Sequence, residues 1–223
     1  MNDIGIGIMC FGADKYFEHT QMLIETLKGI DTYILTDNPV KFPEAQKTIK
    51  YDRAVKSYHD KIILAREILK SRDVCIVLDA DALIKDTTIV YDLLNYQFQE
   101  GITYIDYLSM VPYHSISDIE RTERWVPYLD RLKDIYPEYH HLETIHEYFM
   151  VFKQDIKNEF FVKYEQLQII KEYCDVLCNK EVLGAGEGIS IQVAAQMTNT
   201  PIRKDLELNK IVFNKILNIT QRR

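Results

Sequence analysis

The run Val74-Cys75-Ile76-Val77-Leu78 is the most hydrophobic and most β-branched stretch of the sequence, and Asp79-Ala80-Asp81 follows it directly. A short run that is apolar at every position is typical of a parallel strand covered on both faces, because alternation would leave one face polar. The run therefore predicts a central strand of a buried sheet. The acidic tripeptide is expected at the carboxyl end of that strand, where α/β sheets bind ligands.

Segments with the same character precede this strand. Ile4–Cys10 is a continuous apolar run, and Thr32–Leu35 is a second one. Helical spacing of apolar residues is found over Lys15–Leu27 and over Lys56–Lys70, with Asp14 expected to cap the first of these helices. Strands that alternate with helices predict an α/β fold with three layers and a mostly parallel central sheet.

The second half of the sequence is less regular, and its patterns predict three kinds of element. Strands are expected over Thr103–Leu108 and Glu147–Phe152, helices over Ser117–His141, Ile156–Tyr173 and Ile189–Met197, and a strand or short helix over Ile211–Leu217. No linker-like segment divides the chain, so we expect a single domain over residues 1–223.

Composition and charge restrict the function classes. The 223 residues include 27 Lys and Arg against 34 Asp and Glu, a formal net charge of −7, which argues against a broad nucleic-acid footprint. The four cysteines are too few and too scattered for a disulfide scaffold. No apolar run approaches the ~20 residues of a membrane span, and the run Ile4–Phe11 is interrupted by glycines, as in a strand rather than a signal peptide. We therefore expect a cytoplasmic protein.

The strongest chemical signal is the pair Asp79 and Asp81. Two carboxylates just past a buried strand reduce stability unless a positive charge neutralises them. Mg²⁺ and Mn²⁺ suit carboxylate oxygens, and two carboxylates suffice when a diphosphate supplies further ligands. The alternative is a turn in which Asp79 caps a following helix and Asp81 is solvated.

A second signal is Gly184-Ala185-Gly186-Glu187-Gly188. Glycines let the backbone approach a ligand closely, and the charge of Glu187 is not shielded by neighbouring side chains. Such a glutamate can act as a nucleophile, as a general base or as a hydrogen-bond acceptor for a substrate hydroxyl. The alternative is a plain loop before a helix, with a favourable glutamate in the first turn.

Weaker signals surround these two. Lys61 or Arg66 is expected to offset the charge near Asp79 or to contact a diphosphate, although both fit a solvated helix face equally well. His114, and His146 beside Glu147, are candidates for contact with a second substrate, and ordinary surface positions explain them too.

Taken together, these residues resemble glycosyltransferases of the GT-A fold. Ile6–Gly12 resembles the first strand, whose end contacts the nucleotide, and Val77–Asp81 resembles the D-x-D strand end that binds a metal and the donor diphosphate. Tyr33–Pro39 resembles the Y-x-x-F-T-D-x-P segment of the retaining family 6, the blood-group and α-1,3-galactosyl enzymes. Glu187 falls where that family keeps the glutamate of W-H-D-E-S. No Trp-His-Asp precedes Glu187, however, and no Gly-Gly pair follows Glu147–Phe152.

The resemblance implies a metal-dependent transfer of a sugar from a nucleotide-sugar, UDP-linked, to a hydroxyl acceptor with retention of configuration. Residues 1–110 would bind the donor, and residues 111–223 would bind the acceptor and carry the catalytic Glu187. Asp79 and Asp81 would hold Mn²⁺ or Mg²⁺. The implied donor contacts are Phe11, Gly12, Tyr16, Asp37, Lys61, Asp79, Ala80 and Asp81. The implied acceptor contacts are His114, His146, Glu147 and Gly186.

Three rival functions stay open at this point. A phosphohydrolase of the haloacid-dehalogenase type also places D-x-D after a strand, although normally after the first one. A sugar-nucleotide-binding domain without catalysis would keep the same site, and a nucleotidylyltransferase shares the fold. The acceptor (a glycan, a protein, a small molecule or a modified nucleobase) and the oligomeric state are not determined by the sequence.

Overall fold

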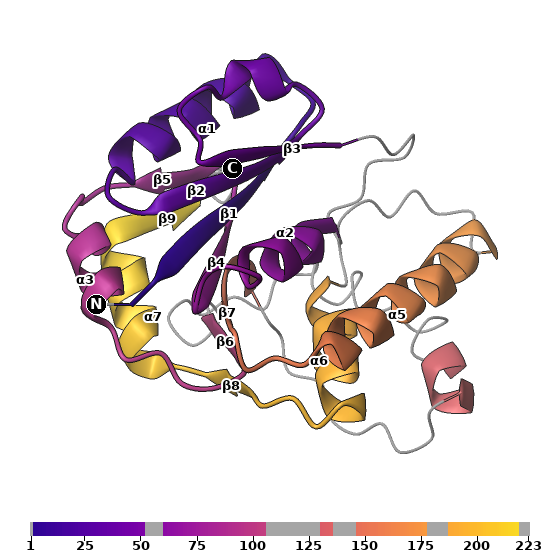
Figure 1. Ribbon diagram of the computed structural model, residues 1–223. Helices are drawn as coiled ribbons and strands as arrows, with labels where there is room; N and C mark the ends of the chain where they lie inside the picture. The colour runs from indigo at the N-terminus through magenta and orange to yellow at the C-terminus, as the bar shows by residue number, and fades with distance from the viewer. Residues whose placement is uncertain (1, 52–59, 106–129, 136–145, 178–186, 219–223) are drawn as a thin grey trace, which may run out of the picture.

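The computed structural model describes residues 2–51, 60–105, 130–135, 146–177 and 187–218 (Figure 1). Seven strands of this part form one sheet in the order β3-β2-β1-β4-β7-β6-β8, and β5 and β9 pair separately. The strands are β1 (Ile4–Cys10), β2 (Asp31–Thr36), β3 (Lys47–Lys50), β4 (Val74–Asp79), β5 (Ala82–Ile84), β6 (Ile102–Ile105), β7 (His146–Lys153), β8 (Ile202–Lys204) and β9 (Ile216–Asn218).

Helices cover both faces of the large sheet. The helices are α1 (Asp14–Thr26), α2 (Lys61–Ile68), α3 (Ile89–Asn95), α5 (Asn158–Leu177), α6 (Glu187–Met197) and α7 (Leu206–Lys215), with a 3₁₀ turn η1 (Pro39–Lys41). Side chains of α2, α5 and α6 form one buried cluster with the sheet, and side chains of α1, α3 and α7 form another on the opposite face (Figure 1). The predicted three-layer α/β architecture is confirmed.

The sheet is mostly parallel. β1 pairs in parallel with β2 and β4, β2 with β3, and β6 with β8, whereas β7 runs antiparallel to both of its neighbours. The apolar run at residues 74–78 forms the middle strand of the seven, as its composition predicts. Strands from both halves of the chain share this sheet, which gives the molecule a common core.

The glycines of β1 bring α2 close to the sheet. Ile4, Ile6 and Ile8 face the cluster that contains α1, so Gly5 and Gly7 face α2. A Cβ atom on Gly5 would lie 2.5 Å from Cγ2 of Ile68, and one on Gly7 would lie 3.1 Å from Cβ of Leu64. This close packing fixes α2 against β1, and its first residue, Lys61, therefore has a defined place beside the ends of the strands.

The substitution Gly5→Ala should lower the free energy of unfolding by about 1–3 kcal/mol, because the new methyl group overpacks the contact with Ile68. Urea unfolding measures the change. In an Ile68→Ala background the added methyl has room, so Gly5→Ala should cost clearly less there. An equal loss of stability in both backgrounds would contradict this account of the packing.

Several expectations need correction. Asp14 does not cap α1: it is the first residue of the helix, Ala13 is the N-cap, and no side chain caps it. The alternative in which Asp79 caps a following helix is also wrong, because the segment after Asp81 forms the strand β5. Polar short strands β3 and β8 and helix α3 were not predicted, since they lack a long apolar pattern.

Other boundaries agree or fall outside the described residues. α5 and α6 and the strands β6 and β7 lie where helices and strands were expected. The final segment contains both predicted types, a helix (α7) followed by a strand (β9). Of the predicted helix Ser117–His141, only residues 130–135 are described, and they are helical.

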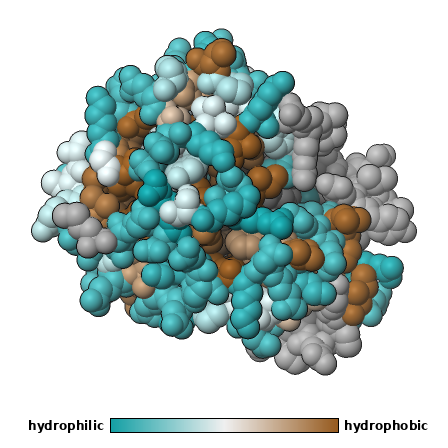
Figure 2. Space-filling view, in the orientation of Figure 1, coloured by the Kyte–Doolittle hydropathy of each residue, from teal (hydrophilic) through white to brown (hydrophobic). Residues whose placement is uncertain are grey.

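On the face shown in Figure 2, hydrophobic residues occur in small groups between hydrophilic ones. Among the described residues, no helix combines the length and the apolar character needed to cross a membrane.

Candidate functional site

The carboxyl ends of three parallel strands meet at one edge of the sheet. In the strand register, Cys10 at the end of β1 pairs with Thr36 at the end of β2, and Met9 pairs with Asp79 at the end of β4. Phe11, Asp37 and Asp79 therefore lie at this edge, as predicted. From β1 the chain continues outward to β2 and β3, and α2 then leads to β4 on the other side of β1, so β1 and β4 flank the topological switch point of the sheet. Ligands of open α/β sheets bind at such a point.

Lys61 links two acidic residues at this edge. Its Nζ lies 2.5 Å from Oδ1 of Asp79 and 3.7 Å from Oε1 of Glu187. The lysine side chain is 7% exposed and that of Glu187 is 3% exposed, whereas Asp79 keeps 26% of its side chain exposed. The first residues of α2 and α6 thus approach the end of β4 from one face of the sheet. We call Lys61, Asp79 and Glu187 the charged triad.

Because the charged triad is largely buried, its ion pairs matter for the stability of the fold. A charge removed from water is tolerated only when other charges or hydrogen bonds compensate it. Removing one partner of a buried ion pair is destabilising by about 3–5 kcal/mol, which makes the triad a unit rather than three separate groups. Glu187 was predicted to be unshielded within a loop. That prediction is wrong, because Glu187 begins α6 and has the Lys61 ammonium beside it.

Aromatic and acidic groups extend the edge toward β3. Phe11 packs on Tyr51 with ring centroids 5.5 Å apart, and the Tyr51 hydroxyl donates a hydrogen bond to Asp60, which precedes Lys61. The Tyr51 amide in turn donates to the Thr36 carbonyl at 2.8 Å. This chain of contacts ties the ends of β1 and β2 to the start of α2. Tyr51 and Asp60 were missed from the sequence because β3, which leads to Tyr51, was not predicted.

The residues present fit a divalent cation with two protein ligands. Asp79 and the buried Asp81 offer carboxylate oxygens, which hard cations prefer, at the end of β4. Among the described residues, no three His, Cys, Asp or Glu side chains gather into a metal-binding group. A cation held here would therefore need further ligands from water or from a bound phosphate.

Other predicted donor contacts surround the ends of the strands. Gly12 has a φ of 99°, and the space where its Cβ would stand is open to 4 Å, which suits close approach of a ligand to the backbone. Phe11 packs with the cluster of α2, α5 and α6, and Tyr16 with the cluster of α1, α3 and α7. The structure thus places these two rings in clusters on opposite faces of the sheet. That both flank one base stays a prediction.

The predicted acceptor contacts are only partly described. β7 runs antiparallel to β4, with Leu78 level with Phe149, so the backbone of His146 and Glu147 begins β7 at the same edge as Asp79. His114 and Gly186 lie outside the described residues. Arg66, the alternative to Lys61, pairs with Glu165 on the surface at 3.1 Å instead of with Asp79.

The thiol beside this edge is inert at neutral pH. Cys10 is fully buried, and burial raises its pKa to about 11, an effect that the nearby Asp37 charge reinforces. Protonated thiols are poor nucleophiles and poor metal ligands. Cys10 therefore contributes packing rather than chemistry.

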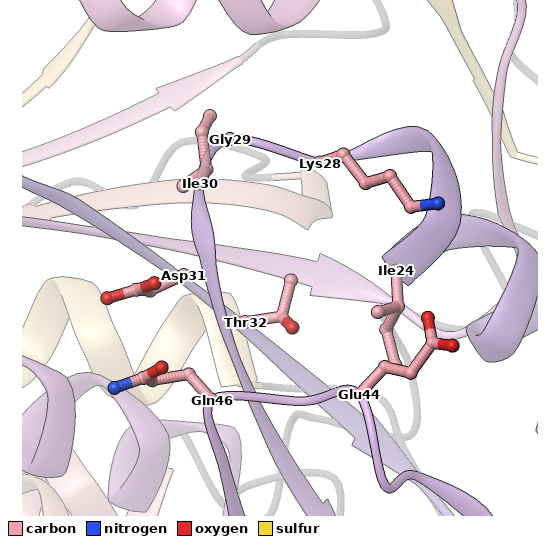
Figure 3. A pocket seen from close by; sticks show the side chains of 8 residues that line it. All are labelled: Ile24, Lys28, Gly29, Ile30, Asp31, Thr32, Glu44 and Gln46. Atoms are coloured by element: carbon pink, nitrogen blue, oxygen red, sulfur yellow. The ribbon is translucent and has the colours of Figure 1, made fainter.

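A pocket lies at the opposite end of β2 (Figure 3). Its lining comes from the end of α1, the start of β2 and the segment before β3. Asp31 and Gln46 point to one side of β2 and Lys28 to the other, so they do not converge on one ligand group. Asp31 moreover forms an ion pair with Arg72. This pocket is remote from the carboxyl edge and is not part of the candidate site.

No protein-family model matches this sequence, and no curated protein matches it either. Among solved structures, the glycosyltransferase GlyE of Streptococcus pneumoniae TIGR4 is 9% identical over 93% of this chain and 46% of its own, with a TM-score of 0.47. The galactosyltransferase LgtC in complex with donor and acceptor sugar analogues is 12% identical over 85% of this chain and 69% of its own, with a TM-score of 0.47.

A third structure, CMP:2-keto-3-deoxy-manno-octonic acid synthetase complexed with CTP, is 13% identical over 91% of this chain and 89% of its own, with a TM-score of 0.45. This chain spans about half the length of GlyE. At these identities and TM-scores, the likeness assigns no activity to the chain, and a functional hypothesis has to stand on the residues of the site.

Proposed function

We propose that this protein is a metal-dependent glycosyltransferase that moves a sugar from a nucleotide-sugar, UDP-linked, to a hydroxyl acceptor with retention of configuration. The observation that carries the proposal is the place of Asp79: an acidic pair ends the middle strand of the sheet, beside the topological switch point. The motifs that resemble GT-A enzymes, and family 6 among them, come together at that edge. We propose that residues 1–223 act as one domain.

Asp79 and Asp81 would hold Mn²⁺ or Mg²⁺, which when bound neutralises charge on the leaving diphosphate as a Lewis acid. Phe11, Asp37 and the open backbone at Gly12 would bind the nucleoside. Tyr16 would contact the base from the α1 side, and Lys61 and Ala80 would lie along the diphosphate. These residues orient the donor so that its sugar extends past β4.

Transfer breaks the bond between the anomeric carbon and the diphosphate oxygen, and forms a bond from that carbon to the acceptor oxygen. Positive charge develops on the anomeric carbon during this exchange. Glu187, the carboxylate that shares Lys61 with Asp79, would stabilise that charge or hold the acceptor hydroxyl, whose proton would pass to the leaving diphosphate. His114, His146, Glu147 and Gly186 would surround the acceptor.

A donor screen tests the proposal. The full chain is incubated with Mn²⁺ and, in turn, with UDP-, GDP- and CMP-sugars, and nucleotide release is measured by chromatography. We expect metal-dependent turnover of one donor class, UDP-sugars, and no phosphate release from phosphomonoesters. Phosphate release from phosphomonoesters with every nucleotide-sugar intact would favour a phosphohydrolase and overturn the proposal.

A further inference from the structure

The Lys61 ammonium lies where a cation bound to Asp79 would repel it. Its ammonium lies 2.5 Å from Oδ1 of Asp79, and only 7% of its side chain is exposed. Close packing of α2 against the glycines of β1 fixes the helix that carries Lys61. Oε1 of Glu187 lies 3.7 Å from the same ammonium. The protein thus provides its own positive charge at the carboxylate predicted to ligate a metal.

We propose that Lys61 is a positioning residue whose ammonium competes with a divalent cation for Asp79, so that this protein binds the cation weakly alone and strongly together with a diphosphate. The inference deepens the proposed function and rests on it for the identity of the diphosphate as a donor. It predicts that the cation and the diphosphate bind cooperatively, which the presence of Asp79 and Asp81 alone does not imply.

The competition arises from repulsion between like charges. A cation ligated by Asp79 would stand within a few ångströms of the Lys61 ammonium, whose side chain is only 7% exposed, and like charges at that distance repel each other. Lys61 must therefore leave Asp79, and a buried ammonium cannot leave one partner without gaining another. Glu187 offers one partner, since it already lies at 3.7 Å.

A diphosphate offers the second partner. Its oxygens accept hydrogen bonds from an ammonium and supply ligands to a cation at the same time. When the diphosphate and the cation bind together, Asp79 therefore exchanges the ammonium for the cation, and Lys61 exchanges Asp79 for a phosphate oxygen. Binding of the cation alone takes the Asp79 contact from Lys61, and the cation brings no acceptor for the ammonium in its place.

The test measures binding of Mn²⁺ alone, without nucleotide, by calorimetry or by electron paramagnetic resonance. We expect the Lys61→Met variant to bind Mn²⁺ at least about tenfold more tightly than the unaltered protein, since Asp79 is then released from its ion pair. Lys61→Arg, which keeps the charge, should bind like the unaltered protein. Asp79→Asn introduced into Lys61→Met should abolish the gain.

Lys70→Met is the matched control. Lys70 lies in the turn that follows α2, its ammonium pairs with Glu67 on the surface, and 65% of its side chain is exposed. This variant should leave Mn²⁺ affinity unchanged. Equal Mn²⁺ affinity in Lys61→Met and in the unaltered protein, with both folded, would overturn the inference.

Loss of Lys61 leaves Asp79 and Glu187 close to each other without their shared cation, so the melting temperature of each variant is followed as well. Lys61→Gln, which retains a hydrogen-bond donor, is a second variant for the same titration. If either variant is unstable, Mn²⁺ should raise its melting temperature more than it raises that of the unaltered protein. An equal rise in all of them would contradict the competition.

Failure of the inference and failure of the proposed function give different results. Because Mn²⁺ alone is the probe, the titration does not depend on any sugar being transferred. Donor turnover with no effect of Lys61 on Mn²⁺ affinity would overturn only the competition. A tenfold effect of Lys61→Met in a protein that turns over no nucleotide-sugar would overturn only the glycosyltransferase assignment.

Discussion

Replacement of Asp79 by asparagine should reduce nucleotide-sugar turnover by about 10³-fold. The change removes a charged ligand of the Mn²⁺ or Mg²⁺ ion that would neutralise the leaving diphosphate. Asparagine has nearly the same shape, so packing at the end of β4 is retained. The Asp81→Asn variant should show a loss of the same kind, and the pair together should lose little more than the worse of the two, since both act on one cation.

Initial rates at saturating donor and Mn²⁺, over a range of Mn²⁺ concentrations, measure this effect. Asp73→Asn is the matched control: Asp73 directly precedes β4, at the opposite end of the same strand, and is exposed. It should retain full activity. Undiminished, Mn²⁺-dependent turnover by Asp79→Asn would show that Asp79 does not hold the metal.

The second large effect is expected for Glu187→Gln. Its rate of sugar transfer should fall by about 10²–10³-fold, because a neutral amide stabilises the developing positive charge much less than a carboxylate does. Donor affinity should change little, since Glu187 belongs to a different element from Asp79 and is not among the proposed donor contacts. The loss should therefore appear in kcat rather than in KM for the donor.

Glu159→Gln provides the comparison for this variant. Glu159 occupies the first turn of α5 as Glu187 occupies that of α6, but its side chain is exposed. It should behave like the unaltered enzyme. If Glu187→Gln transferred sugar at the full rate while remaining folded, Glu187 would be a structural partner of Lys61 and not a catalytic residue.

The central strands were predictable because their side chains are apolar on both faces. Ile4–Cys10 has the predicted boundaries, and the run at residues 74–78 lies in the middle of the sheet, since only a doubly covered strand tolerates such composition. The place of Asp79 at the carboxyl edge follows from that strand directly. β3 and β8 were not predictable, because short edge strands with charged residues carry no apolar signal.

The charged triad was only partly predictable. Sequence spacing predicts a helix over Lys56–Lys70 that contains Lys61, but the contact of Lys61 with Asp79 depends on how closely α2 packs against Gly5 and Gly7. That distance is a property of tertiary packing. The glycine-rich pattern around Glu187 similarly favours a loop, whereas the structure begins α6 at Glu187 and buries it. Tertiary burial overrides the local preference of glycine there.

The most direct test of the account is a crystal structure of the protein with an unreactive UDP-sugar analogue and Mn²⁺. We predict that Mn²⁺ binds Asp79, Asp81 and the diphosphate beyond the carboxyl ends of β1 and β4, with Lys61 turned from Asp79 toward phosphate oxygen. A donor bound elsewhere, with Lys61 still paired to Asp79 and no metal beside either aspartate, would contradict the central claim.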